Sequence, residues 1–233
     1  MKTIWENLLN VLKEIGEASK YLNFPVVSGN VSFYNQTKEI GIKPTPSIGG
    51  VGLIKNYKNM ITMNFKEINN LVLVIGKTEG HIDQSLFART ILDEKNGPPP
   101  EVNLFNEKNN GESILDLINK GLVKSVHDIS LGGLLTALSK MCIKGNKGIK
   151  LKKAKNLLHE IEYFFAEDQG RYIIEINPDK LKEVTKILDK NSVHFEELGI
   201  IVENDMIINE KTKVTIDELR SYNTNWLTKY MSS

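Results

Sequence analysis

The sequence predicts an α/β (α+β) fold in two lobes, residues 1–70 and residues 71–233. In the second lobe, short runs of Val, Ile and Leu alternate with segments whose apolar residues recur at helical spacing. This alternation is typical of helices that pack against a sheet. The first lobe contains one amphipathic segment and two apolar runs in polar surroundings. We place the boundary where the apolar run Leu71–Ile75 begins.

The first lobe is expected to begin with a helix and to continue with two strands. The helix is indicated by apolar residues at helical spacing, namely Ile4, Leu8, Leu12 and Ile15. It should end between Gly16 and Lys20. The strands are expected at Phe24–Ser32 and Ser47–Ile54, on either side of a polar turn.

The second lobe is expected to hold five strands and five helices in alternation. The strands are predicted at residues 71–74, 122–127, 172–176, 195–202 and 206–208. The helices are predicted at residues 85–92, 113–119, 131–143, 179–188 and from residue 216 onward. Gly97 to Pro100 should form a rigid extended connector.

The composition favours a globular protein without a large charged partner. The chain has 40% apolar and 25% charged residues, with 30 basic residues against 29 acidic ones. The net charge of +1 gives no electrostatic footprint for nucleic acid or a membrane surface. No apolar run reaches the about 18 residues of a membrane helix, and no signal peptide is visible, so the cytoplasm is the expected location.

Cysteine and histidine usage indicates neither a disulfide nor a zinc site. The single cysteine, Cys142, lies on an apolar helix stripe and is expected in the core. The four histidines have no spacing typical of metal ligands.

The most informative motif follows the first predicted strand, where apolar residues give way to Ser28, Gly29, Asn30 and Ser32. A glycine allows close approach of the backbone, an Asn amide oxygen can bind a hard cation, and hydroxyls donate to phosphate oxygens. The motif therefore indicates a phosphorylated ligand with Mg²⁺. The same residues are also ordinary turn formers, so a plain turn remains an alternative.

Two motifs of the second lobe are weaker candidate sites. The first, His127 to Gly133, ends a predicted strand and opens a helix, where free N–H groups favour anions. Alternatively, Asp128 or Ser130 caps the helix and the glycines allow close packing. In the second, Glu167 to Arg171, either Gln169 or Arg171 orients a polar substrate, or the motif is a turn with a local ion pair.

An ordered set of segments resembles one enzyme family. The segments are PVVSGNVSFYN, PTPSIGGVGLI, the Gln84-Ser85-Leu86 stretch, GPPPEVNL, VHDISLGGLLTALSKM and FFAEDQGRYIIEI. Together they resemble the C-terminal part of phosphoribosylformylglycinamidine synthase, the ATP-dependent subunit of the purine pathway. The resemblance implies an incomplete ferredoxin-like, barrel-forming N-terminal lobe, followed by an α/β lobe of the aminoimidazole ribonucleotide synthase-like type. Both lobes would belong to the second of two homologous halves.

The resemblance also implies roles for three residues. Gly29 matches the position near ATP, Asn30 the position that coordinates Mg²⁺, and Ser32 the position that contacts formylglycinamide ribonucleotide. The family reaction converts the amide of that ribonucleotide to an amidine with ATP and with ammonia from a glutaminase subunit. These three residues suit a supporting role through positioning and charge. None is a nucleophile or general base, so no catalytic residue is expected in this chain.

The chain departs from the family pattern in three respects. An Asp-rich segment that helps to hold nucleotide and the whole first half are missing, and Gln36 stands where relatives commonly carry Glu. We therefore expect the isolated chain to be catalytically silent and to need the missing N-terminal half. The glutaminase subunit and a small accessory subunit are the further expected partners.

Two other interpretations remain open at this point. The chain could be a non-catalytic scaffold half stabilised by nucleotide, or another enzyme of the superfamily such as aminoimidazole ribonucleotide synthase. In addition, unpaired strand edges in an incomplete lobe tend to associate, which predicts a homodimer through residues 24–54.

Overall fold

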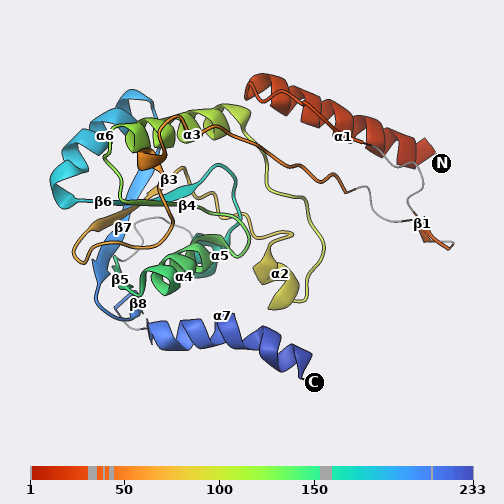
Figure 1. Cartoon of the computed structure of the whole chain (residues 1–233). Helices are drawn as coiled ribbons and strands as arrows, with labels where there is room; N and C mark the ends of the chain where they lie inside the picture. Colours follow the sequence, from red (N-terminus) through yellow and green to blue (C-terminus); the bar gives the residue numbers. More distant parts are fainter. Residues whose placement is uncertain are drawn as a thin grey trace. The chain divides into compact units, whose positions relative to one another are not determined.

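The computed structural model describes residues 2–30, 36–38, 40–41, 45–152, 159–210 and 212–232 (Figure 1). It divides into a first unit, residues 1–55, and a second unit, residues 56–233.

In its described residues, the first unit contains one helix, two short paired strands and segments without regular secondary structure. Helix α1 spans Lys2–Tyr21, which confirms the predicted amphipathic helix. Strands β1 (Gln36–Thr37) and β2 (Ile40–Gly41) pair antiparallel in a two-stranded sheet.

The two longer strands predicted in the first unit are wrong for the residues that the structure describes. Residues 24–30 and 47–54 are extended but form no strand, while residues 31 and 32 of the first prediction lie outside the described residues. Val27, Val51 and Leu53 are 92%, 96% and 90% exposed. A strand exists only through hydrogen bonds to a neighbouring strand, and these apolar segments have no such neighbour among the described residues.

The second unit is built on a mixed sheet of seven strands among its described residues, in the order β4-β6-β3-β7-β5-β8-β9. The strands are β3 (Leu71–Ile75), β4 (Ser125–Asp128), β5 (Gly148–Leu151), β6 (Tyr172–Ile176), β7 (Phe195–Val202), β8 (Met206–Ile208) and β9 (Thr212–Val214). Neighbours pair antiparallel except β5 and β8, which are parallel.

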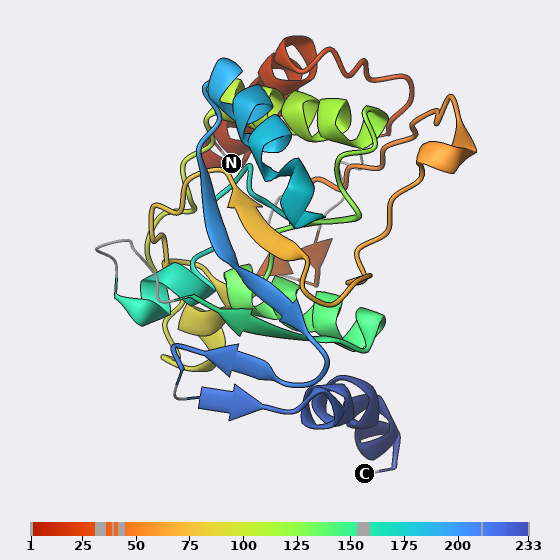
Figure 2. The ribbon, with the colours of Figure 1, turned by 90° about the vertical axis from the view of Figure 1, so that its left-hand side faces the viewer.

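Helices cover both faces of this sheet, as Figures 1 and 2 show. The helices of the second unit are α2 (Leu86–Thr90), α3 (Leu104–Asn119), α4 (Gly133–Gly145), α5 (Glu160–Phe165), α6 (Leu181–Lys190) and α7 (Ile216–Met231), with short 3₁₀ turns at Tyr57–Asn59 and Pro178–Lys180. Helices α3 and α6 lie on one face, and α4 and α5 lie on the other.

The central strand β3 explains why both faces are covered. Its side chains alternate between two apolar clusters: Val72 and Val74 contact the α4 and α5 side, while Leu73 and Ile75 contact the α3 and α6 side. All four are at most 1% exposed. Burying one such side chain contributes roughly 1.5–3 kcal/mol, so a continuous run of apolar residues requires helices on both sides.

Cys142 of α4 belongs to the first of these clusters and is fully buried, which confirms the prediction of a core position. Burial raises the pKa of its thiol to about 12, so the thiol stays protonated at neutral pH. In the part of the chain that the structure describes, no helix has both the length and the apolar character needed to cross a membrane.

Candidate functional site

The segment Phe24–Asn30 is an open, extended piece of backbone. Ser28, Gly29 and Asn30 are all exposed, and no atom lies within 4 Å of the position that a Cβ on Gly29 would take. Ser32 lies outside the described residues. The backbone at Gly29 is therefore accessible to a ligand, but the described neighbours form no cavity around it.

The second apolar segment of the first unit runs close to the first one. A Cβ on Gly50 would lie 3.2 Å from Cζ of Phe24, so the aromatic ring covers this glycine. Gly50 allows the two segments that carry the SGN and PSIGGVG motifs to lie side by side. Phe24 itself stays 46% exposed.

In the second unit, the His127 to Gly133 motif links β4 to α4. We predicted a ligand at the carboxyl end of this strand because open, mostly parallel α/β sheets bind ligands there. In the structure, however, β4 pairs antiparallel with β6, so that rule does not apply to this strand. The alternative interpretation, close packing at the glycines, is confirmed at Gly133: this residue has a φ of +69°, and a Cβ there would lie 2.7 Å from the carbonyl oxygen of Ala166.

The helix cap at this motif is not the one predicted. The N-cap residue of α4 is Gly132, which has no side chain to accept a capping hydrogen bond. The predicted capping by Asp128 or Ser130 is therefore wrong. Instead, Oε1 of Glu167 accepts a hydrogen bond from the backbone N–H of Gly132 at 2.8 Å. A carboxylate of the same chain thus occupies the place where a bound anion was expected.

His127 and Asp128 form a contact of their own at the end of β4. Nδ1 of His127 lies 3.1 Å from Oδ1 of Asp128. His127 is 9% exposed, and its Nε2 is buried without a hydrogen-bond partner among the described residues. Although partial burial favours the neutral acid, His127 and the Ser130 hydroxyl lower the pKa of the exposed Asp128 carboxyl below its ordinary value.

The Glu167 to Arg171 motif holds a long irregular segment, residues 77–100, which we call the strap. The carboxylate of Asp168 accepts three backbone N–H groups of the strap, from Glu79 at 3.0 Å, Gly80 at 3.1 Å and His81 at 3.1 Å. Oε1 of Glu167 also accepts the N–H of Leu86 at 2.7 Å, at the start of α2. Adjacent carboxylates therefore clamp the strap at two places.

Arg171 completes this clamp from inside the protein. Its side chain is fully buried, and it donates to Thr78 Oγ1 at 3.0 Å, to the Ala166 carbonyl at 2.7 Å and to the Asp168 carbonyl at 3.1 Å. Burial lowers the pKa of its guanidinium, and Asp168 opposes that shift. Gln169 is exposed and donates to the carbonyl of Glu167 at 3.2 Å. Arg171 thus makes structural contacts that tie the strap to its own motif, and Gln169 lies at the surface.

Sequence reasoning missed a further buried carboxylate, Glu175 in β6. It is 0% exposed and accepts hydrogen bonds from four donors, namely Lys66 N, Glu67 N, Asn70 Nδ2 and Ser125 Oγ at 2.8–3.0 Å. The only sequence signal was one acid within the apolar strand Tyr172–Ile176. Glu175 anchors the segment that leads into β3.

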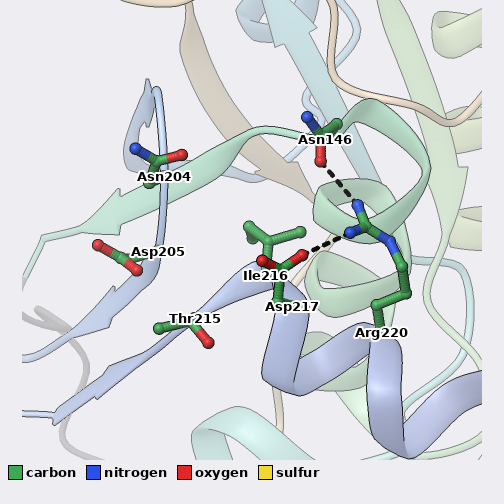
Figure 3. A pocket seen from close by; sticks show the side chains of 7 residues that line it. All are labelled: Asn146, Asn204, Asp205, Thr215, Ile216, Asp217 and Arg220. Carbon is green, nitrogen blue, oxygen red and sulfur yellow. Dashed lines mark hydrogen bonds and ion pairs between the residues drawn. The ribbon is translucent and has the colours of Figure 1, made fainter.

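One polar pocket of about 540 Å³ lies where α4 ends and α7 begins (Figure 3). Its lining residues are Asn146, Asn204, Asp205, Thr215, Ile216, Asp217 and Arg220. Arg220 already donates to Asp217 Oδ1 at 2.6 Å and to Asn146 Oδ1 at 2.7 Å within it. None of the residues predicted as sites lines this pocket, and sequence patterns could not find it because its walls come from separate segments.

Comparison with known proteins identifies the family. The domain described as "AIR synthase related protein, C-terminal domain" matches residues 67–209. The subunit PurL of phosphoribosylformylglycinamidine synthase from Pelagibacter ubique is 70% identical over 219 residues, which are 94% of this chain and 30% of that protein. The PurL subunit from Bartonella henselae is 40% identical over 228 residues, which are 98% of this chain and 31% of that protein.

Solved structures show the same fold. A Thermotoga maritima PurL complexed with FGAR matches with a TM-score of 0.58 and 19% identity over 70% of this chain and 29% of that chain. Another, complexed with ATP, matches with a TM-score of 0.55 and 17% identity over 70% of this chain and 27% of that chain.

The chain spans about three tenths of the length of the curated relatives it matches. Because these relatives are named as subunits of the synthase, neither a pure scaffold nor another enzyme of the superfamily is favoured. The resemblance drawn from the sequence motifs is confirmed: the chain belongs to the AIR synthase related family and is a relative of the PurL subunit of phosphoribosylformylglycinamidine synthase.

Proposed function

We propose that this chain is the part of a phosphoribosylformylglycinamidine synthase that completes an active site carried on another part of the protein. The synthase converts formylglycinamide ribonucleotide to the amidine with ATP and glutamine-derived ammonia in purine biosynthesis. The observation that carries the proposal is the 70% identity over 219 residues to a subunit of this synthase. Residues 1–70 would then be the end of one lobe, and residues 71–233 the α/β lobe that follows it.

The proposed contribution of the chain is a lip formed by Gly29, Asn30 and Ser32. The open space around Gly29 would allow its backbone to approach ATP closely. The exposed amide oxygen of Asn30 suits Mg²⁺, which prefers oxygen ligands. When bound, Mg²⁺ would neutralise charge on the transferring phosphoryl group. Ser32 would contact the ribonucleotide, and Ser28 would add a neighbouring hydroxyl.

One amide oxygen cannot hold Mg²⁺ alone, since this ion demands six ligands. Among the described residues, no group of three or more His, Cys, Asp or Glu side chains could hold a metal ion. The remaining protein ligands are therefore proposed to come from the missing N-terminal half, beside water and the phosphate oxygens of ATP. The glutaminase subunit and the small accessory subunit are the further proposed partners, and the cytoplasm is the proposed location.

The exposed apolar side chains in the segment 24–54 support the proposal that this segment pairs with other polypeptide. Val27, Val51 and Leu53 have the character of strand residues and are at least 90% exposed. They would pair with the missing N-terminal half when it is present, and with a second copy of this chain when it is not.

The test is an amidine-forming assay with formylglycinamide ribonucleotide, ATP, Mg²⁺ and ammonia. We expect no turnover from this chain alone. Turnover should appear when a polypeptide corresponding to the remaining length of a relative is added in trans. Turnover by the chain alone, or its absence from the reconstituted pair with both parts folded, would contradict the proposal.

A further inference from the structure

The sequence contains two Asn-Gly pairs, Asn96-Gly97 and Asn110-Gly111. An Asn side chain in front of a glycine can react with its own backbone, because its amide carbon lies within reach of the next backbone nitrogen and glycine has no Cβ to obstruct the attack. The reaction requires that both groups are free to adopt the geometry of ring closure. The local structure therefore distinguishes the two pairs.

Asn110 is protected by its surroundings. It lies in helix α3 and is 7% exposed, and its Nδ2 donates to the Gly170 carbonyl at 2.9 Å. Gly111 lies inside the same helix, where each backbone N–H is committed to the carbonyl four residues earlier. The Asn110 amide and the Gly111 nitrogen therefore cannot meet unless the helix opens.

Asn96 has neither of these restraints. It is exposed, lies in the strap outside any helix or strand, and its side-chain amide makes no hydrogen bond with the residues that the structure describes. Gly97 has a φ of +94°, a backbone conformation that few residues other than glycine adopt. The Gly97 nitrogen can therefore attack Cγ of Asn96 without the unfolding of any regular element.

The two residues that flank Asn96 are held by one side chain. Nε2 of Gln84 donates to the carbonyl of Lys95 at 2.9 Å and to that of Gly97 at 3.1 Å, and we call these two hydrogen bonds the Gln84 clasp. The Asp83 carboxylate lies beside Gly97, so close that a Cβ there would collide with it. The clasp therefore depends on a fixed length of backbone between Lys95 and Gly97.

We propose that Asn96 is a site of spontaneous modification to aspartate and isoaspartate, which opens the Gln84 clasp. The Gly97 nitrogen bonds to Cγ of Asn96, the bond from Cγ to Nδ2 breaks, and the proton of the Gly97 amide leaves with the ammonia. Water then adds to one of the two carbonyl carbons of the cyclic imide. One ring opening gives aspartate, and the other gives isoaspartate, whose main chain is longer by one carbon. This site does not rest on the proposed function.

Isoaspartate at this position changes the strap in two ways. The extra carbon moves apart the two carbonyls that the Gln84 amide bonds, so at least one of them loses its donor. The new carboxylate also places a negative charge near the Asp83 carboxylate, and like charges repel. The strap should therefore loosen around residues 84–97, while Asp168 still holds residues 79–81.

The test is peptide mapping by mass spectrometry of the full chain after incubation at neutral and at mildly alkaline pH, with a fresh sample as the baseline. Trypsin cleaves after Lys95, Lys108 and Lys120, so the two Asn-Gly pairs fall in separate peptides. The peptide 96–108 should gain the mass of an exchange of NH for O and should separate into two modified forms. Its modification should be at least tenfold faster than that of the peptide 109–120.

Two controls separate the causes. In the chain unfolded with guanidinium, the two peptides should be modified at similar rates, because helix α3 no longer protects Asn110. In Asn96→Gln, the peptide 96–108 should stay at the baseline, because a Gln side chain would have to close a larger ring that forms more slowly. Hydrogen exchange of residues 84–97 should become faster on incubation in the wild type but not in Asn96→Gln.

Three results would overturn the proposal. The first is modification of Asn96 no faster than that of Asn110 in the folded chain. The second is a tenfold difference that persists in the unfolded chain, because the structure would then not be its cause. The third is wild-type protein that carries isoaspartate at position 96 and keeps the hydrogen exchange of the fresh sample, because the Gln84 clasp would then have stayed closed.

Discussion

Replacing Asp168 with Asn should loosen the strap and destabilise the second unit. Asp168 is 6% exposed, and its two oxygens accept three backbone N–H groups of residues 79–81. Asn keeps one acceptor oxygen but turns an NH₂ group toward at least one of these donors. It also removes the negative charge 3.9 Å from the buried Arg171 guanidinium.

The size of this effect follows from the bonds that are lost. A hydrogen bond to a charged acceptor contributes about 1.5–3 kcal/mol, and a buried donor left without a partner costs a similar amount. Since the strap can turn partly toward water, we expect a loss of about 2–4 kcal/mol. For a protein of this size, about 1 kcal/mol corresponds to roughly 2–4 °C, so the Tm should fall by about 5–15 °C.

Thermal unfolding by circular dichroism measures the loss, and hydrogen exchange locates it. The amides of residues 79–81 should exchange faster in Asp168→Asn than in the wild type. The control is Asp189→Asn, an exposed carboxylate on α6. If Asp168→Asn melts with the control and these three amides keep their protection, the clamp does not hold the strap.

Three other substitutions test separate parts of the structure. Glu175→Gln should cost about 2–4 kcal/mol in urea unfolding, because a buried carboxylate with four donors loses its charge; an unchanged midpoint would refute its anchoring role. Gly133→Ala should destabilise by more than about 2 kcal/mol, whereas Gly121→Ala, also at positive φ but with open space around it, should cost less; equal losses would exclude close packing as the cause. Burial raises the pKa of Glu107, although the Gly170 N–H opposes this, so the folded state holds its proton to higher pH than the unfolded chain. The favourable contribution is present below the ordinary pKa of about 4.3 and is lost as pH rises through the raised value. Glu107→Gln should therefore gain stability at neutral pH but not at low pH, and a gain that is independent of pH in thermal melts would contradict this.

The sequence was sufficient where local pattern and tertiary context agree. The run Leu71–Ile75 predicted a strand, and it became the central strand β3 because both its faces could be covered. Helix α3 shows the opposite case. It was predicted from residue 113 but begins at Leu104, because Asn103 caps it and Asn110 bonds to the Gly170 carbonyl at 2.9 Å. Such polar residues lower helix propensity, and only distant contacts reverse that preference.

Some elements carried too little signal to be found. Strands β5 and β9 and the short helix α5 were not predicted as elements. Strand β5, Gly148–Leu151, lies in a Lys-rich stretch, and its strand character comes from pairing with β7 and β8. Periodicity cannot detect three or four residues whose conformation is set by distant neighbours.

The candidate sites differ in how far the sequence could define them. The motifs identified the family, but the role of Glu167 and Asp168 could not be read locally, because their partners lie 35 to 89 residues away. The opposite holds for the backbone around Gly29, where the local sequence suggests a role but the described structure does not complete a site. The residue types there predict a phosphate and Mg²⁺ site, whereas the described neighbours form no cavity around Gly29.

The measurement that tests the lip most directly is the Mg²⁺ dependence of amidine formation by the reconstituted pair. Asn30→Ala should raise the Mg²⁺ concentration needed for half-maximal turnover at least tenfold, because one oxygen ligand is lost. Asn10→Ala, an exposed residue of α1, should leave it unchanged. If Asn30→Ala shows the same Mg²⁺ dependence and turnover as the wild type, Asn30 does not help to bind the ion, and the lip formed by Gly29, Asn30 and Ser32 is not part of the active site.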